Sequence, residues 1–178
     1  MNDLELIENT KTTFNQIEKS IDLLSKHNAI QVRLRSRFDP GEPFVAILKY
    51  KEYWSNNFLC SIKRLFRPAK AKKLIGTSIY SIQKPETRHP KFIKKLSNEF
   101  YLVSSSVLNW ANLAILVDRD TYLRAIIKKA ENTQSKNNIN GFKNIEIELN
   151  SLWWREKEFK ILMAPGLFKH KRLSHRGY

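Results

Sequence analysis

The sequence predicts an all-α or mainly α protein, a helical bundle of about five to six helices. The chain has 178 residues, which is the length of one domain and enough to bury a hydrophobic core. Its 42% of hydrophobic residues is typical of a globular protein. With only 5 Gly and 6 Pro, it lacks the turn residues that a sandwich of short strands needs. We therefore expect one helical domain over residues 1–168 and a flexible basic tail over 169–178.

The N-terminal segment predicts an amphipathic helix over about residues 3–27. Its apolar residues recur at spacings of seven, three, four and three, which places them on one face of a helix. The stripe is narrow, so two roles stay open. It either faces the core or forms a seam with a protein partner or a second copy of the chain. The stripe consists of Ile7, Phe14, Ile17, Ile21 and Leu24.

Residues 30–48 carry a different pattern. Apolar and basic residues alternate from 30 to 38, which is the period of a strand, and both a short strand and an extended arm stay open there. The run Asp39-Pro-Gly-Glu-Pro43 predicts a turn. Residues 44–48 fit either the second strand of a short basic β-hairpin or the start of a helix. The apolar spacing from Ile47 to Leu65 favours a helix over 44–66.

The middle of the chain predicts two further helices. The first follows Pro68 and ends before Pro85. The second covers 96–117, where seven apolar residues recur at alternating spacings of four and three, as expected for the central helix of a bundle. Residues 100–117 carry no charge, but their three Ser and two Asn indicate a buried helix and not a membrane span.

The C-terminal part predicts two more helices. Asp120 is the expected N-cap of the first, which reaches Ala130. The second carries an apolar stripe from Phe142 to Phe159 and ends before Pro165.

The positive charge of the chain is concentrated in two segments. The formal net charge is +15, and residues 29–95 hold sixteen basic and four acidic residues, a net charge of +12. The last ten residues hold four basic residues and no acidic residue. Clustered charge of this kind is typical of proteins that bind a polyanion. We expect nucleic acid, with DNA favoured over RNA, and mainly phosphate contacts, which position a protein without reading sequence.

The expected nucleic-acid contacts lie in these two segments. The basic candidates are Arg33, Arg35, Arg37, Lys63, Arg64, Arg67, Lys70, Lys72, Lys73, Lys169, Lys171, Arg172 and Arg176. Aromatic residues near basic ones are candidates for stacking on unpaired bases. These are Tyr50, Tyr53, Trp54 and Trp154.

The sequence does not predict an enzyme. The glycines are scattered, so no phosphate-binding loop is present, and a lone Cys60 with four histidines predicts neither a metal site nor a cofactor site. Asp118, Asp120 and Lys128 are the one set that suits a metal-dependent nuclease, but helix capping explains both aspartates. The N-terminus has neither the basic region nor the apolar run of a signal peptide, so we expect a cytoplasmic protein without a membrane anchor.

Three stretches resemble a known group of proteins. They are 60–72 (CSIKRLFRPAKAK), 107–113 (VLNWANL) and 145–152 (IEIELNSL). Their order is similar to that in an uncharacterised family of small proteins carried on bacterial integrating conjugative elements, some of which are labelled integrase regulators. Here Ala111 and Asn112 stand where a basic residue is expected after the Trp. The resemblance implies DNA as the partner and a bacterial mobile element as the setting.

A second function stays open beside the DNA-binding regulator. The chain also fits an RNA-binding or protein-interaction subunit of a larger nucleoprotein assembly, such as a ribosome-like particle or an RNA-guided complex. In that case the basic segment contacts RNA and the apolar stripe of residues 7–24 contacts a neighbouring protein.

Overall fold

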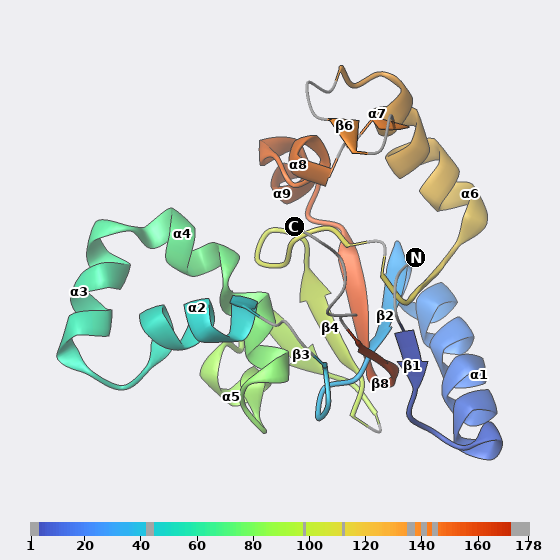
Figure 1. Ribbon diagram of the computed structural model, residues 1–178, viewed down its shortest axis with the longest axis horizontal. Coiled ribbons are helices and arrows are strands. Elements are labelled where there is room, and N and C mark those ends of the chain that lie inside the picture. The colour runs from blue at the N-terminus through green and yellow to red at the C-terminus, as the bar shows by residue number, and fades with distance from the viewer. Residues whose placement is uncertain are drawn as a thin grey trace.

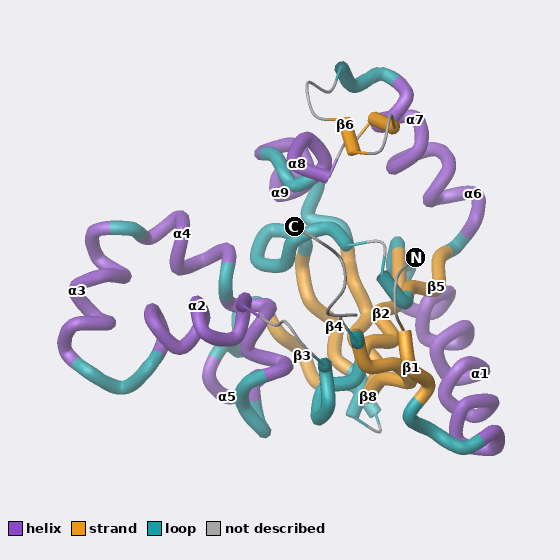
Figure 2. Tube along the Cα trace, in the orientation of Figure 1, coloured by secondary structure: helices purple, strands orange, loops and turns teal. Residues whose placement is uncertain are grey.

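A computed structural model describes residues 4–41, 45–97, 99–111, 113–134, 138–139, 142–143 and 146–171 of the chain. It contains a mixed β-sheet with helices around it, so the prediction of a mainly helical bundle is wrong. Figure 1 shows the sheet in the middle of the molecule, one long helix on its right, a group of helices on its left and a third group above it. Figure 2 shows how the strands gather at this centre.

Six strands form the main sheet of the described residues. The strand order is β3-β4-β8-β2-β5, and β1 also pairs with β8. β2 and β8 run parallel, and the other pairs are antiparallel. The strands are β1 (Leu4–Leu6), β2 (Gln31–Arg35), β3 (Ile93–Lys95), β4 (Tyr101–Ser104), β5 (Ile115–Val117) and β8 (Lys160–His170).

β8 is the centre of the sheet, in a region where a helix ending before Pro165 was expected. Residues 161–164 are apolar and all buried, as in a strand that is covered on both faces. Gly166 bends the strand near the point where its register with β2 shifts. Its φ is +108°, and a Cβ there would lie 2.2 Å from the Cα of Ser36, so only glycine fits. The strand extends to His170, so the start of the expected flexible tail is ordered.

The predicted central helix over 96–117 is also wrong. This segment forms β4, a loop, and β5. Tyr101 and Val103 are buried while Leu102 and Ser104 are partly exposed, which is the alternation of a strand. Neighbouring strands can hydrogen-bond with such short segments, and this pairing outweighs the helical spacing of the apolar residues. The loop after β4 is held by Ser105, whose backbone N–H donates to the Phe159 carbonyl.

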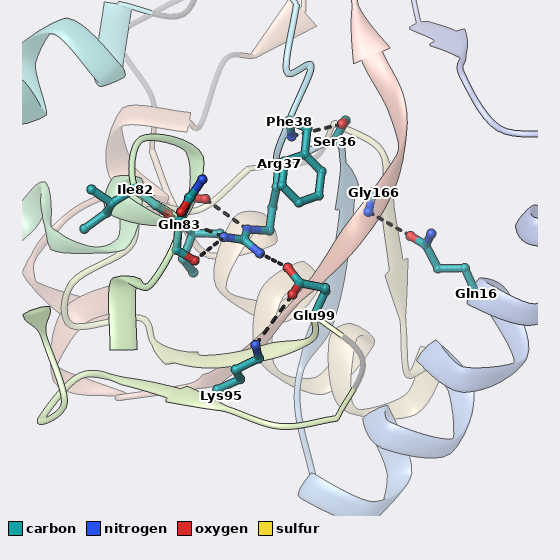
Figure 3. Close-up of polar contacts among 10 residues, drawn as sticks. Gln16, Ser36, Arg37, Phe38, Ile82, Gln83, Lys95, Glu99 and Gly166 are labelled. Atoms are coloured by element: carbon teal, nitrogen blue, oxygen red, sulfur yellow. Dashed lines mark hydrogen bonds and ion pairs between the residues drawn. The ribbon is translucent and has the colours of Figure 1, made fainter. Parts of the chain in front are cut away.

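Helix α1 (Thr10–His27) confirms the predicted N-terminal helix, although it is shorter at its start. Asn9 caps it by accepting a hydrogen bond from the Thr12 N–H. The predicted stripe is divided: Leu24 is buried against the sheet, whereas Phe14 and Ile21 are 66% and 53% exposed. The buried face instead includes Gln16, whose Oε1 accepts a hydrogen bond from the Gly166 N–H (Figure 3).

Five short helices follow β2 and form the group on the left of Figure 1. The predicted helix over 44–66 is split in two, because Asn57 caps a new helix by accepting a hydrogen bond from the Cys60 N–H. Of the alternatives for residues 30–48, the strand at 31–35 is confirmed, and no second strand of a hairpin follows it among residues 45–48. The helices are α2 (Val45–Trp54), α3 (Phe58–Phe66), α4 (Pro68–Lys73), the 3-10 helix η1 (Ile75–Tyr80) and α5 (Pro85–Arg88).

The third group lies between β5 and β8. Asp118, and not the expected Asp120, is the N-cap of the first helix there, because its Oδ1 accepts a hydrogen bond from the Thr121 N–H. The described elements are α6 (Arg119–Tyr122), the π-helix η2 (Leu123–Ile127), α7 (Lys128–Glu131), β6 (Asn138–Ile139), β7 (Phe142–Lys143), α8 (Glu146–Leu149) and α9 (Leu152–Glu156). Among the described residues, no helix has the length and apolar character that crossing a membrane requires.

Candidate nucleic-acid interface

Arg37, which follows β2, makes its contacts in the interior of the protein. Arg37 is 5% exposed, and its guanidinium donates to the carbonyls of Ile79, Ile82 and Gln83. It also forms an ion pair with Glu99 (Figure 3) and lies over the ring of Tyr101, 4.6 Å from its centroid. All three of its nitrogen atoms therefore donate to protein groups, and the guanidinium is not placed to contact a phosphate.

The two arginines within β2 are also largely internal. Arg33 is 8% exposed and donates to the Asn109 carbonyl, while Arg35 donates to the Pro40 carbonyl over 2.6 Å. Loss of hydration lowers the pKa of both guanidinium groups, and the nearby Tyr80 partly opposes this shift. Both arginines line a cavity of about 300 Å³. Arg33 is buried apart from this cavity wall, while Arg35 is partly exposed.

The basic residues of α3 and of the α3–α4 junction are divided between internal contacts and solvent. Lys63 donates to Glu52 over 2.9 Å. Arg64 donates to the Tyr53 carbonyl over 2.6 Å and lies 5.0 Å from the ring centre of Trp54. Arg67 is exposed where α3 meets α4. Of these three, only Arg67 is both exposed and outside the ion pairs of the described residues.

Helix α4 presents its lysines to solvent. Lys70, Lys72 and Lys73 are exposed, and none of them forms an ion pair with a carboxylate in the described part of the chain. Lys70 lies 5.4 Å from the ring centre of Tyr53, and Lys72 lies 5.6 Å from that of Phe92. These cations are held over aromatic rings but keep their charge available to an anion.

Two hollows beside α4 form what we call the α4 groove. Their volumes are about 480 and 500 Å³, and both are lined by Lys73, Asn150 and Arg155. Lys73 also lines the cavity that contains Arg33 and Arg35, so the three spaces adjoin. The acidic residues at the groove are Glu146, Glu156 and Glu158. The basic residues are Lys49, Lys70, Lys72, Lys73 and Arg155.

Two of these basic residues, Lys49 and Arg155, were not predicted. They come from α2 and α9, more than a hundred residues apart, and only the fold brings them to α4. Arg155 donates to Asn109 Oδ1 over 2.7 Å, and partial burial lowers its pKa. The sequence signals were that Lys49 precedes Tyr50 and that Arg155 follows two tryptophans, and neither indicated which surface the residue joins.

Three of the four aromatic residues proposed for base stacking are buried. Tyr50, Tyr53 and Trp154 are 3%, 1% and 0% exposed. The Trp154 indole donates to the Leu108 carbonyl over 2.7 Å, and the Tyr50 hydroxyl hydrogen-bonds to His89. Trp54 is partly buried, and its indole donates to the Ala71 carbonyl. These rings are part of the packing between elements, which leaves the first three no face for a base.

The structure describes two of the four basic residues predicted at the C-terminus. Lys169 belongs to β8 and lies within ion-pair distance of Glu5 and Asp39, at 3.6 and 3.5 Å. Lys171 lies 3.4 Å from the same Glu5. Both therefore tie the end of β8 to neighbouring segments. Arg172 and Arg176 lie outside the described residues.

The candidate nuclease set has other roles where the structure describes it. Asp118 caps α6, and its hydrogen bond with Thr121 lowers its pKa. Asp120 lies beside Arg119, at 3.9 Å. In the described part of the chain, no three His, Cys, Asp or Glu side chains gather as metal ligands would.

No family model matches the chain, and no match to it was found among curated proteins or solved structures. The resemblance to proteins of conjugative elements therefore stays a prediction.

Proposed function

We propose that this protein binds nucleic acid, with DNA favoured over RNA, through phosphate contacts along the α4 groove. It acts as a non-enzymatic accessory or regulatory protein in the cytoplasm. The observation that supports this most is the set of lysines on α4 that face solvent, without a carboxylate partner in the described part of the chain, beside Lys49 and Arg155. Each phosphate that such a cation neutralises releases a bound counterion, which favours binding.

The arrangement of the groove supports phosphate contacts more than base contacts. Its cations come from three separate elements and line adjoining hollows, as a backbone with regularly spaced charges requires. Lys70 lies over the ring of Tyr53, which is buried and leaves no face for a base. The three glutamates that line the groove limit where a polyanion can lie, so the strand is expected to follow the side of the groove that α4 forms.

Reversal of the α4 charges tests this proposal. We expect the triple variant Lys70→Glu, Lys72→Glu, Lys73→Glu to lose detectable binding to a labelled oligonucleotide in fluorescence anisotropy. The lysines are exposed, so the circular dichroism of the protein should not change. A matched variant reverses Lys11, Lys19 and Lys26 on α1, on the other side of the molecule (Figure 1). It has the same net charge, and it should keep most of the affinity. Equal losses in both variants would contradict a defined groove.

An exposed apolar surface supports the second candidate, a subunit of a larger nucleoprotein assembly. The buried side of α3 includes Cys60, while its apolar side faces solvent. Such a patch is typical of a protein interface. Size-exclusion chromatography separates the two candidates: a monodisperse protein favours the regulator, and aggregation that RNA or a partner relieves favours the subunit. The exposed residues are Phe58, Leu59, Leu65 and Phe66, which are 67–78% exposed.

A further inference from the structure

A second basic hollow, which shares no lining residue with the α4 groove, lies between the α6–α7 helical segment and α9. Its volume is about 490 Å³, within the range of small-ligand sites, which is roughly 300–1,000 Å³. Its basic lining residues are Arg124, Lys128, Lys129 and Lys157, and no acidic side chain of the described residues lines it. We call it the α7 hollow. The α4 groove, by comparison, includes three glutamates.

Aromatic rings form part of the wall of the α7 hollow. Trp153 is partly exposed and packs edge-on against Phe159, with ring centres 5.8 Å apart and planes at 66°. Lys129 Nζ lies 5.6 Å from the centre of the Trp153 ring. Phe159 also packs against the buried Trp154, which anchors this wall to the core. The indole of Trp153 is therefore held in place by its neighbours while part of it stays accessible.

The opposite wall has an unusual backbone. Residues 123–127 form the π-helix η2, and two lining residues, Arg124 and Ala125, belong to it. A π-helical turn is rare, and it occurs frequently at functional sites because its wider turn redirects side chains. Arg124 and Lys128 lie one turn apart across this irregularity, and both line the hollow. The helix irregularity is thus a second observation, independent of charge, that marks this place.

We propose that the α7 hollow binds one unpaired nucleotide of a nucleic-acid strand, with the base stacked on Trp153 and its phosphate held by the surrounding cations. Stacking uses the flat face of a base, which a duplex hides between neighbouring base pairs. A site of this kind gives the protein a preference for single-stranded over double-stranded nucleic acid. The inference rests on the proposed function, because the other nucleotides of the strand would contact another basic surface of the protein.

Substitution of Trp153 tests the inference. Three labelled probes are compared: a single strand of about 12 nucleotides, a duplex of that length, and a single strand of that length without bases. Trp153→Leu should weaken binding of the single strand about tenfold, since one stacked base contributes about that factor or more. Binding of the duplex and of the abasic strand should not change. Trp153→Phe, which keeps a ring, should retain most of the affinity.

A spectroscopic measurement separates stacking from a purely structural role. The single strand should quench tryptophan fluorescence in the wild type, and the quenching should be largely lost in Trp153→Phe although that variant still binds. Arg119→Gln serves as a control, because Arg119 is exposed on the same helical segment and does not line the hollow. It should change neither affinity nor quenching.

The outcomes of the two proposals can be told apart. If Trp153→Leu weakens all three probes equally, or none, the stacking site is wrong while nucleic-acid binding stands. If the wild type binds the duplex and the abasic strand as tightly as the single strand, the stacking site is also wrong. If the wild type binds none of the probes, the proposed function fails, and the stacking site fails with it.

Discussion

The segment at β2 and the helix α4 each carry three basic residues, but the two regions use them in opposite ways. Arg33, Arg35 and Arg37 follow every second position of an extended segment, which directs all three to one face of the sheet. That face is covered, and the guanidinium groups donate to backbone carbonyls. The lysines of α4 lie on a short helix at the surface and have no carboxylate partner among the described residues.

The difference follows from the chemistry of the arginine and lysine side chains, which suits the first to the interior and the second to the surface. A guanidinium has five donors in a fixed plane, so it can satisfy several buried carbonyls at once. An ammonium is strongly hydrated and costs more to bury, which keeps lysine at the surface. The basic residues of these two regions therefore form two parts: an arginine part at β2 that stabilises the fold and a lysine part on α4 that faces solvent.

Replacement of Arg37 should have the largest effect on stability. Arg37→Met keeps the length of the side chain but removes every donor, so three carbonyls and Glu99 lose their partner. We expect the free energy of unfolding to fall by about 3 kcal/mol, since unpaired buried polar groups are costly. Urea unfolding of the wild type and the variant measures this.

The matched control for Arg37 is on α4. Lys73→Met removes one exposed charge, and the free energy of unfolding should change by less than about 0.5 kcal/mol. If the two variants were equally destabilised, or equally neutral, the distinction between an arginine part and a lysine part would be wrong.

An effect confined to acidic pH is expected at His89, which joins α5 to α2. It is buried, hydrogen-bonded to the Tyr50 hydroxyl at 3.0 Å, and 4.6 Å from Trp54 between ring centres. Burial, with a contribution from Arg88, lowers the pKa of His89 from 6.5 to about 4. The interior thus holds this histidine neutral, in contrast to the charged lysines outside.

The pH dependence of stability follows from this shift. The unfolded chain binds a proton at His89 near pH 6.5 and the folded protein only near pH 4, so the free energy of unfolding falls as the pH drops between these values. Above pH 6.5 the group contributes no pH dependence. Urea unfolding across this range, compared with His89→Gln, isolates the effect. A variant with the same pH dependence as the wild type would contradict the neutral state of His89.

The local chemistry of the sequence predicted some elements correctly. The apolar spacing from Ile7 to Leu24 predicted the helix that the structure has at 10–27, and the alternation at 31–35 is that of a strand. The helix predicted over 96–117 is wrong, because an apolar residue every three or four positions also fits two short strands when neighbouring strands can pair with them. β8 was missed because its apolar run follows helical segments directly, and Pro165 suggested an end where the chain only bends.

The positive charge of the candidate site could be predicted from the sequence, but the set of residues that form it could not. The basic run from Lys63 to Lys73 was visible in the sequence, and α4 does present its lysines to solvent. Which other residues belong to the site is decided by burial, and burial depends on which elements cover each other. For this reason Arg37 and Trp154 belong to the interior, while Lys49 and Arg155 join the α4 groove from distant parts of the chain.

The salt dependence of binding tests the central claim most directly. The logarithm of the affinity should fall linearly with the logarithm of the salt concentration, by about 0.7–0.9 for each phosphate contact. We predict that Lys70→Gln, Lys72→Gln, Lys73→Gln makes this slope shallower by about 2, while Arg37→Lys leaves it unchanged. An α4 variant with the slope of the wild type would show that these lysines do not contact phosphates, and it would contradict the proposed interface.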